Sequence, residues 1–167
     1  SEGYLPLREW LAERMAAHGV ACGPENIMLT AGSQQALDLL GKLFLTRGDT
    51  VVVARPTYLG ALQAFTAYEP NYLDLPDGAL DGDFDARSLM AGRAPKPLGY
   101  FVPDYANPTG ESLTTAQRQA LLELADATDM TLIEDAAYRE LRFAGEALPS
   151  LLALDIDFGQ QDVPAVA

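Results

Sequence analysis

The chain has 167 residues, of which 49% are hydrophobic and 21% are charged, and these proportions suit one globular domain with a substantial core. Its net charge of −13 argues against a nucleic-acid partner, because proteins that bind phosphate backbones concentrate lysine and arginine; the acidity instead indicates a solvated surface. The single cysteine, Cys22, excludes an internal disulfide and cannot build a thiolate metal site alone. No apolar run approaches the roughly 20 residues that span a bilayer, so no membrane partner is expected.

Neither end of the chain resembles a natural terminus. Ser1 opens a segment without the basic residues and apolar core of a signal peptide, and residues 163–167 are apolar and lack a charged tail. We therefore expect both ends to be cuts. The low cysteine content indicates a reducing compartment, and we expect the cytoplasm.

Hydrophobic periodicity predicts helices that alternate with short strands. In chain order, we expect a helix at 5–18, a strand at 26–30, a helix from 31–33 through Phe44, a strand at 50–54, a helix at 59–66, a strand at 71–75, a short helix at 84–90, a strand at 98–102, a helix at 114–128, a strand at 130–133 and a short helix at 136–141. The first helix is expected to be amphipathic, with Leu7 and Trp10 in its apolar stripe. Residues 76–85 are expected to form a loop, and the chain after Leu141 to be irregular.

This alternation predicts an α/β fold with three layers, in which helices cover both faces of a mostly parallel sheet. Ligands of such sheets bind beyond the carboxyl ends of the strands. The candidate site residues are therefore those that follow each predicted strand.

Two candidates follow the earlier strands. Ser33 and Gln34 lie at the start of a helix, where free backbone amides and the helix dipole can bind a phosphate group. The alternative for Ser33 is an ordinary helix cap. Tyr58 follows a buried strand and could stack on a flat ring, although it could equally be a tyrosine of the core or its rim.

Three further candidates follow the later strands. Asn107 is held extended by Pro108 and could donate to a ligand oxygen, or it could bond its own backbone as turn asparagines do. Asp135 directly follows an apolar strand and needs a partner such as a protonated ring nitrogen, unless it caps the next helix. Tyr138 lies one helical turn beyond Asp135 and could reach the same ligand.

Together these groups offer a phosphate anchor, a stacking ring, two donors to an oxygen and an anionic partner for a ring nitrogen. That set matches what pyridoxal 5′-phosphate requires, since a carboxylate keeps the pyridine nitrogen protonated and makes the ring an electron sink. The sequence therefore predicts a site for this cofactor and no metal site.

The motifs Asn107-Pro108-Thr109-Gly110 and Glu134-Asp135-Ala136-Ala137-Tyr138, with the segments at 3–8, 30–36, 48–49 and 55–58, resemble the class I/II (fold-type-I) aminotransferases. The resemblance covers nearly the whole chain. It is strongest to 2-aminoadipate and kynurenine aminotransferases and to the aminotransferase-like domains of MocR-type regulators. It implies that Ser33 and Gln34 hold the phosphate, Tyr58 stacks on the ring, Asn107 and Tyr138 bond the phenolic oxygen, and Asp135 bonds the ring nitrogen.

One element of the family pattern is missing. The Schiff-base lysine of these enzymes would fall at or beyond Ala167, and the only lysines, Lys42 and Lys96, are expected at the surface. Residues 1–167 therefore resemble a partial large domain without the small C-terminal domain, and no catalytic residue is assigned. The chain alone is predicted to be inactive, because it could not join the cofactor covalently.

The resemblance implies a homodimer that moves an amino group between an amino acid and a 2-oxo acid. The alternative is the effector-sensing domain of a MocR-type regulator, in which the cofactor controls DNA binding and a winged helix-turn-helix precedes Ser1. A nucleotide-binding α/β domain is disfavoured, because no predicted strand is followed by Gly-x-Gly-x-x-Gly or a P-loop.

Overall fold

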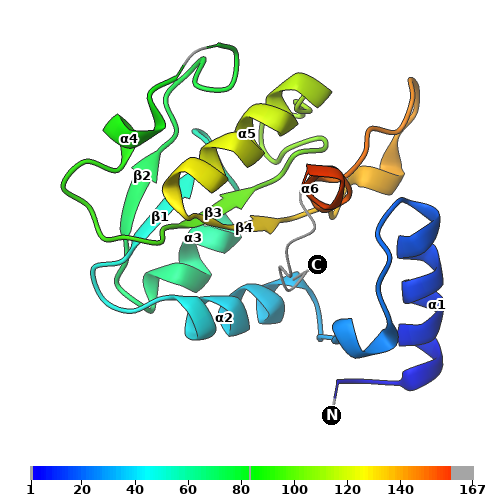
Figure 1. Ribbon diagram of the computed structural model, residues 1–167. Coiled ribbons are helices and arrows are strands. Elements are labelled where there is room, and N and C mark those ends of the chain that lie inside the picture. Colours follow the sequence, from blue (N-terminus) through cyan, green and yellow to red (C-terminus); the bar gives the residue numbers. More distant parts are fainter. Residues whose placement is uncertain (1, 83, 159–167) are drawn as a thin grey trace.

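The computed structural model describes residues 2–82 and 84–158, and its centre is a parallel sheet of four strands (Figure 1). The strands are β1 (Thr50–Val53), β2 (Asn71–Asp74), β3 (Leu98–Phe101) and β4 (Thr131–Glu134), in the order β2-β1-β3-β4. In this register Val53 pairs with Tyr100, and Tyr100 pairs with Ile133. Ser1 and residues 163–167, which were interpreted as cut ends, lie outside the described residues, as does Asp83 of the predicted loop.

The two central strands are buried along their whole length. Every residue of β1 and β3 is buried, as a continuous apolar run predicts for strands covered on both faces. The outer strands β2 and β4 are more exposed.

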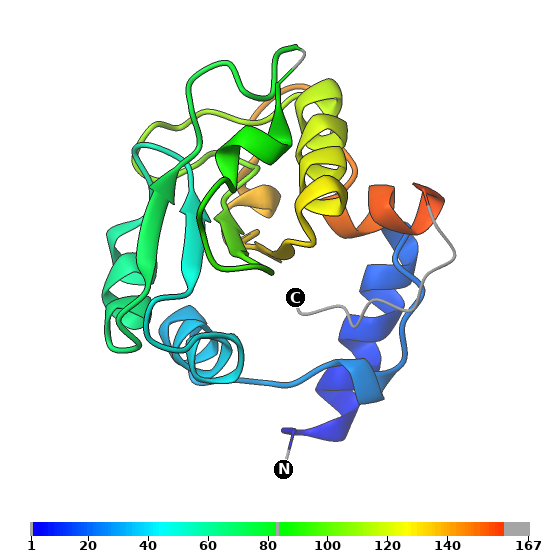
Figure 2. The same cartoon turned by 60° about the vertical axis from the view of Figure 1, so that its left-hand side comes forward.

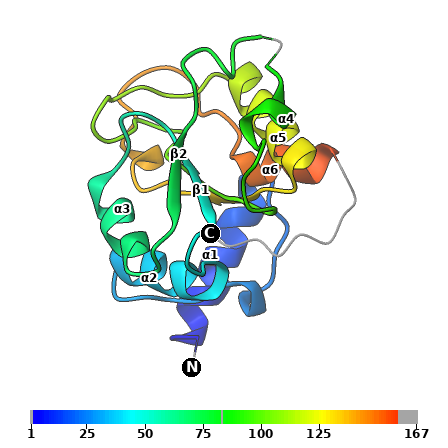
Figure 3. The same cartoon turned by 90° about the vertical axis from the view of Figure 1, so that its left-hand side faces the viewer.

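Helices cover both faces of the sheet, which confirms the predicted three-layer α/β fold (Figure 3). On one face lie α2 (Ser33–Phe44) and α3 (Leu59–Thr66), whose Leu37 and Phe65 pack against Val51 and Tyr100. On the other face lie α4 (Ala86–Leu89), α5 (Thr115–Thr128) and α6 (Leu151–Phe158). Thr114 caps α5 as predicted: its hydroxyl accepts a hydrogen bond from the Gln117 amide.

Helix α1 (Leu5–Ala17) stands to one side of the layered body (Figure 2). The helix itself is confirmed, but its predicted apolar stripe does not face a core. Leu7 is 41% exposed and Trp10 is 53% exposed, while Ala12 is the one buried residue of α1. Farther along the stripe Leu11 and Met15 are half-buried: η1 (Pro24–Asn26) packs beside α1, and the Met15 sulfur accepts from the Cys22 thiol at 3.7 Å. The Arg14 guanidinium lies 5.6 Å from the centre of the exposed Trp10 ring.

Three predictions of secondary structure are wrong. Residues 26–30 do not form a strand of the sheet: a 3₁₀ turn, η1, occupies Pro24–Asn26, and Leu29 donates a single backbone bond to Glu2. The helix expected at 136–141 is reduced to the 3₁₀ turn η2 (Arg139–Leu141), because the backbone bonds of this segment span three residues, from Arg139 to Ala136 and from Leu141 to Tyr138.

The chain after Leu141 is not irregular throughout, because it contains α6. Ser150 caps this helix by accepting a hydrogen bond from the Ala153 amide at 3.0 Å. The Glu134 carboxylate accepts from the amides of Leu151 and Leu152, so the end of β4 is joined to the start of α6. No helix in the described ranges is both long and apolar enough to cross a membrane.

Candidate functional site

Four of the six candidates follow the carboxyl ends of β1, β3 and β4, namely Tyr58, Asn107, Asp135 and Tyr138. Ser33 and Gln34 begin α2 and follow no described strand, because the strand expected at 26–30 is not formed. The chain leaves β1 toward α3 on one face and leaves β3 toward α5 on the other face. Because β1 and β3 are neighbours, their connections diverge at a topological switch point, which is where α/β sheets bind ligands.

The start of α2 provides an anion site. Gly32, at a φ of 121°, is the N-cap residue and makes no side-chain cap bond, so Ser33 is the first helical residue and its hydroxyl is not used as a cap. Among the described residues, the backbone amides of Ser33 and Gln34 find no acceptor. Free amides at the positive end of a 12-residue helix suit a phosphate group.

Tyr58 stands at the start of α3, where it is the N-cap residue and half-buried. Its ring lies against Gly60, since a Cβ built on Gly60 would be 2.5 Å from the ring carbons. The Gln34 side chain donates to the Gly60 carbonyl at 3.0 Å. The start of α2 is therefore joined to the first turn of α3, and Tyr58 packs against the core as a partly buried residue at its rim.

Asp135 follows β4 and uses both carboxylate oxygens. Its Oδ2 accepts a hydrogen bond from the Tyr100 hydroxyl at 2.7 Å, and its Oδ1 accepts from the Ala137 amide at 3.3 Å. The local bond to Ala137 is not the helix cap that was the alternative, because η2 begins at Arg139 with Tyr138 as its N-cap residue. Burial raises the pKa of Tyr100 far above its usual value, and the hydrogen bond and charge of Asp135 raise it further, with smaller effects of Tyr58 and Tyr138.

Asn107 and Tyr138 meet across the mouth of the site. The Asn107 amide donates to the Tyr138 hydroxyl at 3.4 Å, a long bond, and the described residues offer this side chain no backbone partner. The turn closes at Gly110, whose φ is 75° and whose amide donates to Ala106 at 2.6 Å. The side chains of Asn107 and Tyr138 are therefore held near one another and remain accessible.

The sequence model of the family "Aminotransferase class I and II" matches residues 1–158. The chain belongs to this family. The 2-aminoadipate transaminase of Thermus thermophilus is 39% identical over 163 residues, which are 98% of this chain and 40% of that protein. The crystal structure of α-aminoadipate aminotransferase from the same species, complexed with N-(5′-phosphopyridoxyl)-L-leucine, is 41% identical with a TM-score of 0.80, covering 95% of this chain and 39% of that one.

The relatives of this aminotransferase-family chain also include a regulator. The HTH-type transcriptional regulator YdfD of Bacillus subtilis, itself uncharacterized, is 34% identical over 143 residues, which are 84% of this chain and 29% of that protein. The chain thus spans about two fifths of the length of the aminotransferases it matches, and less of the regulator.

Behind the site, this member of the aminotransferase family contains a buried ion cluster that the sequence did not predict. Arg118 of α5 is fully buried and donates to both oxygens of Asp104, at 2.6 and 3.4 Å. Arg139 donates to Asp104 at 3.0 Å and to Glu134 at 2.9 Å. Burial by itself would raise the pKa of Asp104, but the hydrogen bonds and charges of Arg118 and Arg139 outweigh it and hold the pKa below the usual value.

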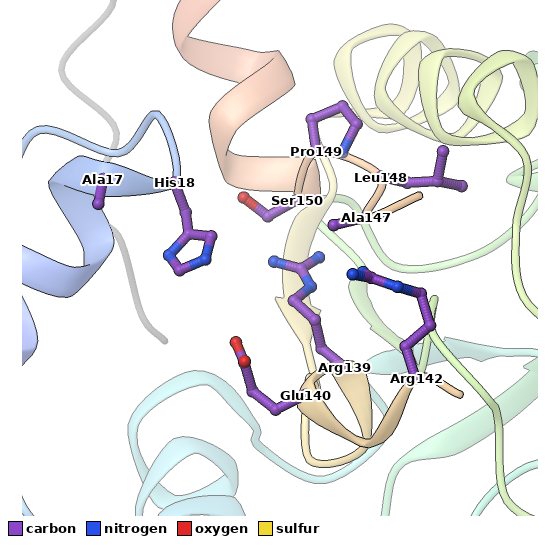
Figure 4. Close-up of a pocket in the computed structure, with 9 residues that line it drawn as sticks. All are labelled: Ala17, His18, Arg139, Glu140, Arg142, Ala147, Leu148, Pro149 and Ser150. Carbon is purple, nitrogen blue, oxygen red and sulfur yellow. The ribbon is translucent and has the colours of Figure 1, made fainter. Parts of the chain in front are cut away.

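A cavity of about 410 Å³ lies beyond this cluster (Figure 4). It is bounded by His18 at the end of α1, by Arg139 and Glu140 of η2, and by the loop that ends at Ser150. None of the six predicted site residues lines it. The cavity is therefore separate from the candidate site.

Both lysines are at the surface, as predicted. Lys42 lies in the last turn of α2, at the end opposite Ser33, and Lys96 precedes β3 at the amino edge of the sheet. The Lys96 ammonium pairs with Asp129 at 3.4 Å. Neither lysine is placed to reach Asp135.

Proposed function

We propose that the chain forms the cofactor-holding part of a pyridoxal-phosphate-dependent aminotransferase, and that residues 1–167 are a partial large domain. The observation that carries the proposal is Asp135, a carboxylate held by Tyr100 at a strand end and grouped with an unpaired helix N-terminus at Ser33. Membership of the aminotransferase family supports the same reading.

The groups present fit the cofactor. The free amides of Ser33 and Gln34 would bind its phosphate, as unpaired amides at a helix start do. The carboxylate of Asp135 keeps acceptor capacity beyond its two present bonds and would accept from the ring N–H. Tyr58 would stack on the ring, and Asn107 and Tyr138 would bond its phenolic oxygen.

When bound, the pyridine ring supplies an electron sink for the chemistry at the substrate's α-carbon. The described residues would hold and orient the ring, and Asp135 would keep a proton at its nitrogen. Since neither Lys42 nor Lys96 is near Asp135, amino transfer is proposed for the whole protein and holding the cofactor for this chain.

The proposed substrates are an amino acid and a 2-oxo acid, and the proposed assembly is a homodimer. The 2-aminoadipate transaminase among the relatives makes 2-aminoadipate the first donor to test. The cytoplasmic location stays a prediction.

The test uses the protein expressed from its complete reading frame. Titration with pyridoxal phosphate should show saturable binding, and Asp135→Asn should weaken it about tenfold or more because a charge-assisted bond is lost. Asp129→Asn, an equivalent change at an exposed pair with Lys96, should bind like the wild type. Formation of glutamate from 2-oxoglutarate and 2-aminoadipate would establish the transfer. Absence of saturable binding would refute the proposal.

A regulator remains a second candidate, because YdfD matches 84% of the chain. The same candidate site would then bind the cofactor, and cofactor binding would control DNA binding. A winged helix-turn-helix encoded before Ser1, with cofactor-dependent retention of promoter DNA and no amino transfer, would favour the regulator.

A further inference from the structure

Tyr100 is buried for a reason that core packing does not explain. It is fully buried in β3 and lies edge-on to Phe65, with ring centres 6.0 Å apart and planes at 76°. A phenylalanine would fill that space equally well. Buried tyrosine hydroxyls need a polar partner, and this one finds it in Asp135, 35 residues away in the sequence, at 2.7 Å.

The sheet register places the pair. Tyr100 pairs with Ile133 on the neighbouring strand, and both belong to the core under α2 and α3. Asp135 lies two residues beyond Ile133 and so on the same face, since side chains alternate along a strand. The amide of Asp135 continues the ladder by donating to Phe101 at 2.9 Å, which fixes its backbone.

The Asp135 carboxylate is consequently held at both oxygens, one by the amide of Ala137 in the following turn and one by the hydroxyl of Tyr100 in β3. The Ala137 bond at 3.3 Å is local and long. The Tyr100 bond is short and originates in the fully buried core. Of the two donors, only Tyr100 connects the carboxylate to the sheet.

We propose that Tyr100 is the positioning residue for Asp135: its hydroxyl fixes the orientation in which the carboxylate meets a protonated ring nitrogen. This inference rests on the proposed function, because it assigns a role within the same site. Tyr100 lies beneath Asp135 and would act on the cofactor through it. The raised pKa of Tyr100 supports this role, since the phenol stays protonated and remains a donor.

The chain offers a matched control for removing this hydroxyl. Tyr68 also donates to an aspartate, the Asp38 carboxylate at 3.0 Å, but this pair joins α2 to the end of α3 at the surface. Tyr68→Phe therefore removes the same kind of bond away from the site. Tyr100→Phe and Tyr68→Phe should be compared in the protein expressed from its complete reading frame.

Two readouts besides activity test the role. Tyr100→Phe should weaken pyridoxal phosphate binding about tenfold and shift the ¹⁵N resonance of the labelled ring nitrogen toward the unprotonated form, while Tyr68→Phe leaves both unchanged. In the cofactor-free protein, a slowly exchanging tyrosine hydroxyl proton should be visible by NMR. Asp135→Asn should shift the resonance of this proton. This measurement leaves the core side chain intact, so it also serves if Tyr100→Phe fails to fold.

The outcomes separate the two claims. If the wild type binds the cofactor and Tyr100→Phe matches it within twofold, with the same ¹⁵N resonance, the positioning role is refuted and the proposed function stands. The role is also refuted if Tyr68→Phe weakens pyridoxal phosphate binding as much as Tyr100→Phe does. It is likewise refuted if Asp135→Asn leaves the resonance of the hydroxyl proton unchanged. If the wild type shows no saturable binding, the proposed function fails and the inference fails with it.

Discussion

Replacing Asp104 by asparagine should strongly destabilise the α5 side of the sheet. The cluster is balanced, with the carboxylates of Asp104 and Glu134 facing the guanidinium groups of Arg118 and Arg139. In the variant, Arg139 keeps Glu134, but Arg118 loses its carboxylate while its side chain is 0% exposed. It retains neutral acceptors alone, namely the carbonyls of Leu113, Pro103 and Pro149 and the amide oxygen of the new asparagine.

The expected magnitude follows from that uncompensated charge. Removing one partner of a buried ion pair typically costs about 3–5 kcal/mol. Hydrogen exchange of the α5 amides that open only on unfolding should therefore accelerate by roughly two to four orders of magnitude, at about 1.4 kcal/mol per tenfold change. Arg47→Ala is the control, because the pair of Arg47 with Glu69 is 83% and 65% exposed and such pairs contribute less than about 1 kcal/mol.

The pH dependence gives a second check on the same variant. The pKa of Asp104 is lowered in the folded chain, so its ionised carboxylate stabilises the fold fully above the unfolded-state pKa of about 4. This stabilisation is lost as the pH falls through the pKa of the folded state. The difference in α5 amide exchange rate between the wild type and Asp104→Asn, corrected for intrinsic exchange, should thus be constant near neutral pH. It should become smaller below about pH 4. Exchange in Asp104→Asn within tenfold of the wild type, or a difference independent of pH, would refute the reasoning.

Three further predictions concern the candidate cofactor site, the cap of α5 and the two lysines. Gly60→Ala would place a methyl group 2.5 Å from the Tyr58 ring carbons, so pyridoxal phosphate affinity should fall about tenfold by titration; unchanged affinity would show that the ring does not contribute. Thr114→Ala removes the cap of α5 and should cost about 1 kcal/mol by exchange of the α5 amides, and a change near zero would contradict the cap's role. Borohydride reduction with pyridoxal phosphate should label Lys42 and Lys96 no faster than an exposed lysine in a peptide, whereas rapid, saturable labelling of either would place it in the site.

Local signals explain which parts of the fold could be predicted. The helix after Thr114 follows from a cap that contacts its near neighbours in sequence, and the β-branched run at Thr50–Val53 has the composition of a strand buried on both faces. Residues 26–30 have a similar apolar composition, yet a strand also needs a partner, and the described chain gives Leu29 only one backbone bond. Sequence composition could not supply that second condition.

The candidate site, too, could be predicted from local sequence signals only in part. Ser33, Tyr58, Asn107, Asp135 and Tyr138 could be proposed because each follows a predicted strand. The hydroxyl that holds Asp135 could not, because an aromatic residue within a buried strand has the pattern of ordinary core. Its role became visible only with the register that sets Tyr100 opposite Ile133.

The adjacent acids Glu134 and Asp135 show how one strand end serves both structure and site. Successive side chains of a strand point to opposite faces, so Glu134 joins Arg139 and the start of α6 while Asp135 meets Tyr100 under α2 and α3. A shift of β4 by one residue would move one acid into its neighbour's place and bring Ile133 or Ala136 into the other place, so that either the ion cluster or the site would lose its carboxylate. The ion cluster on one face therefore holds β4 in the register that the site on the other face requires.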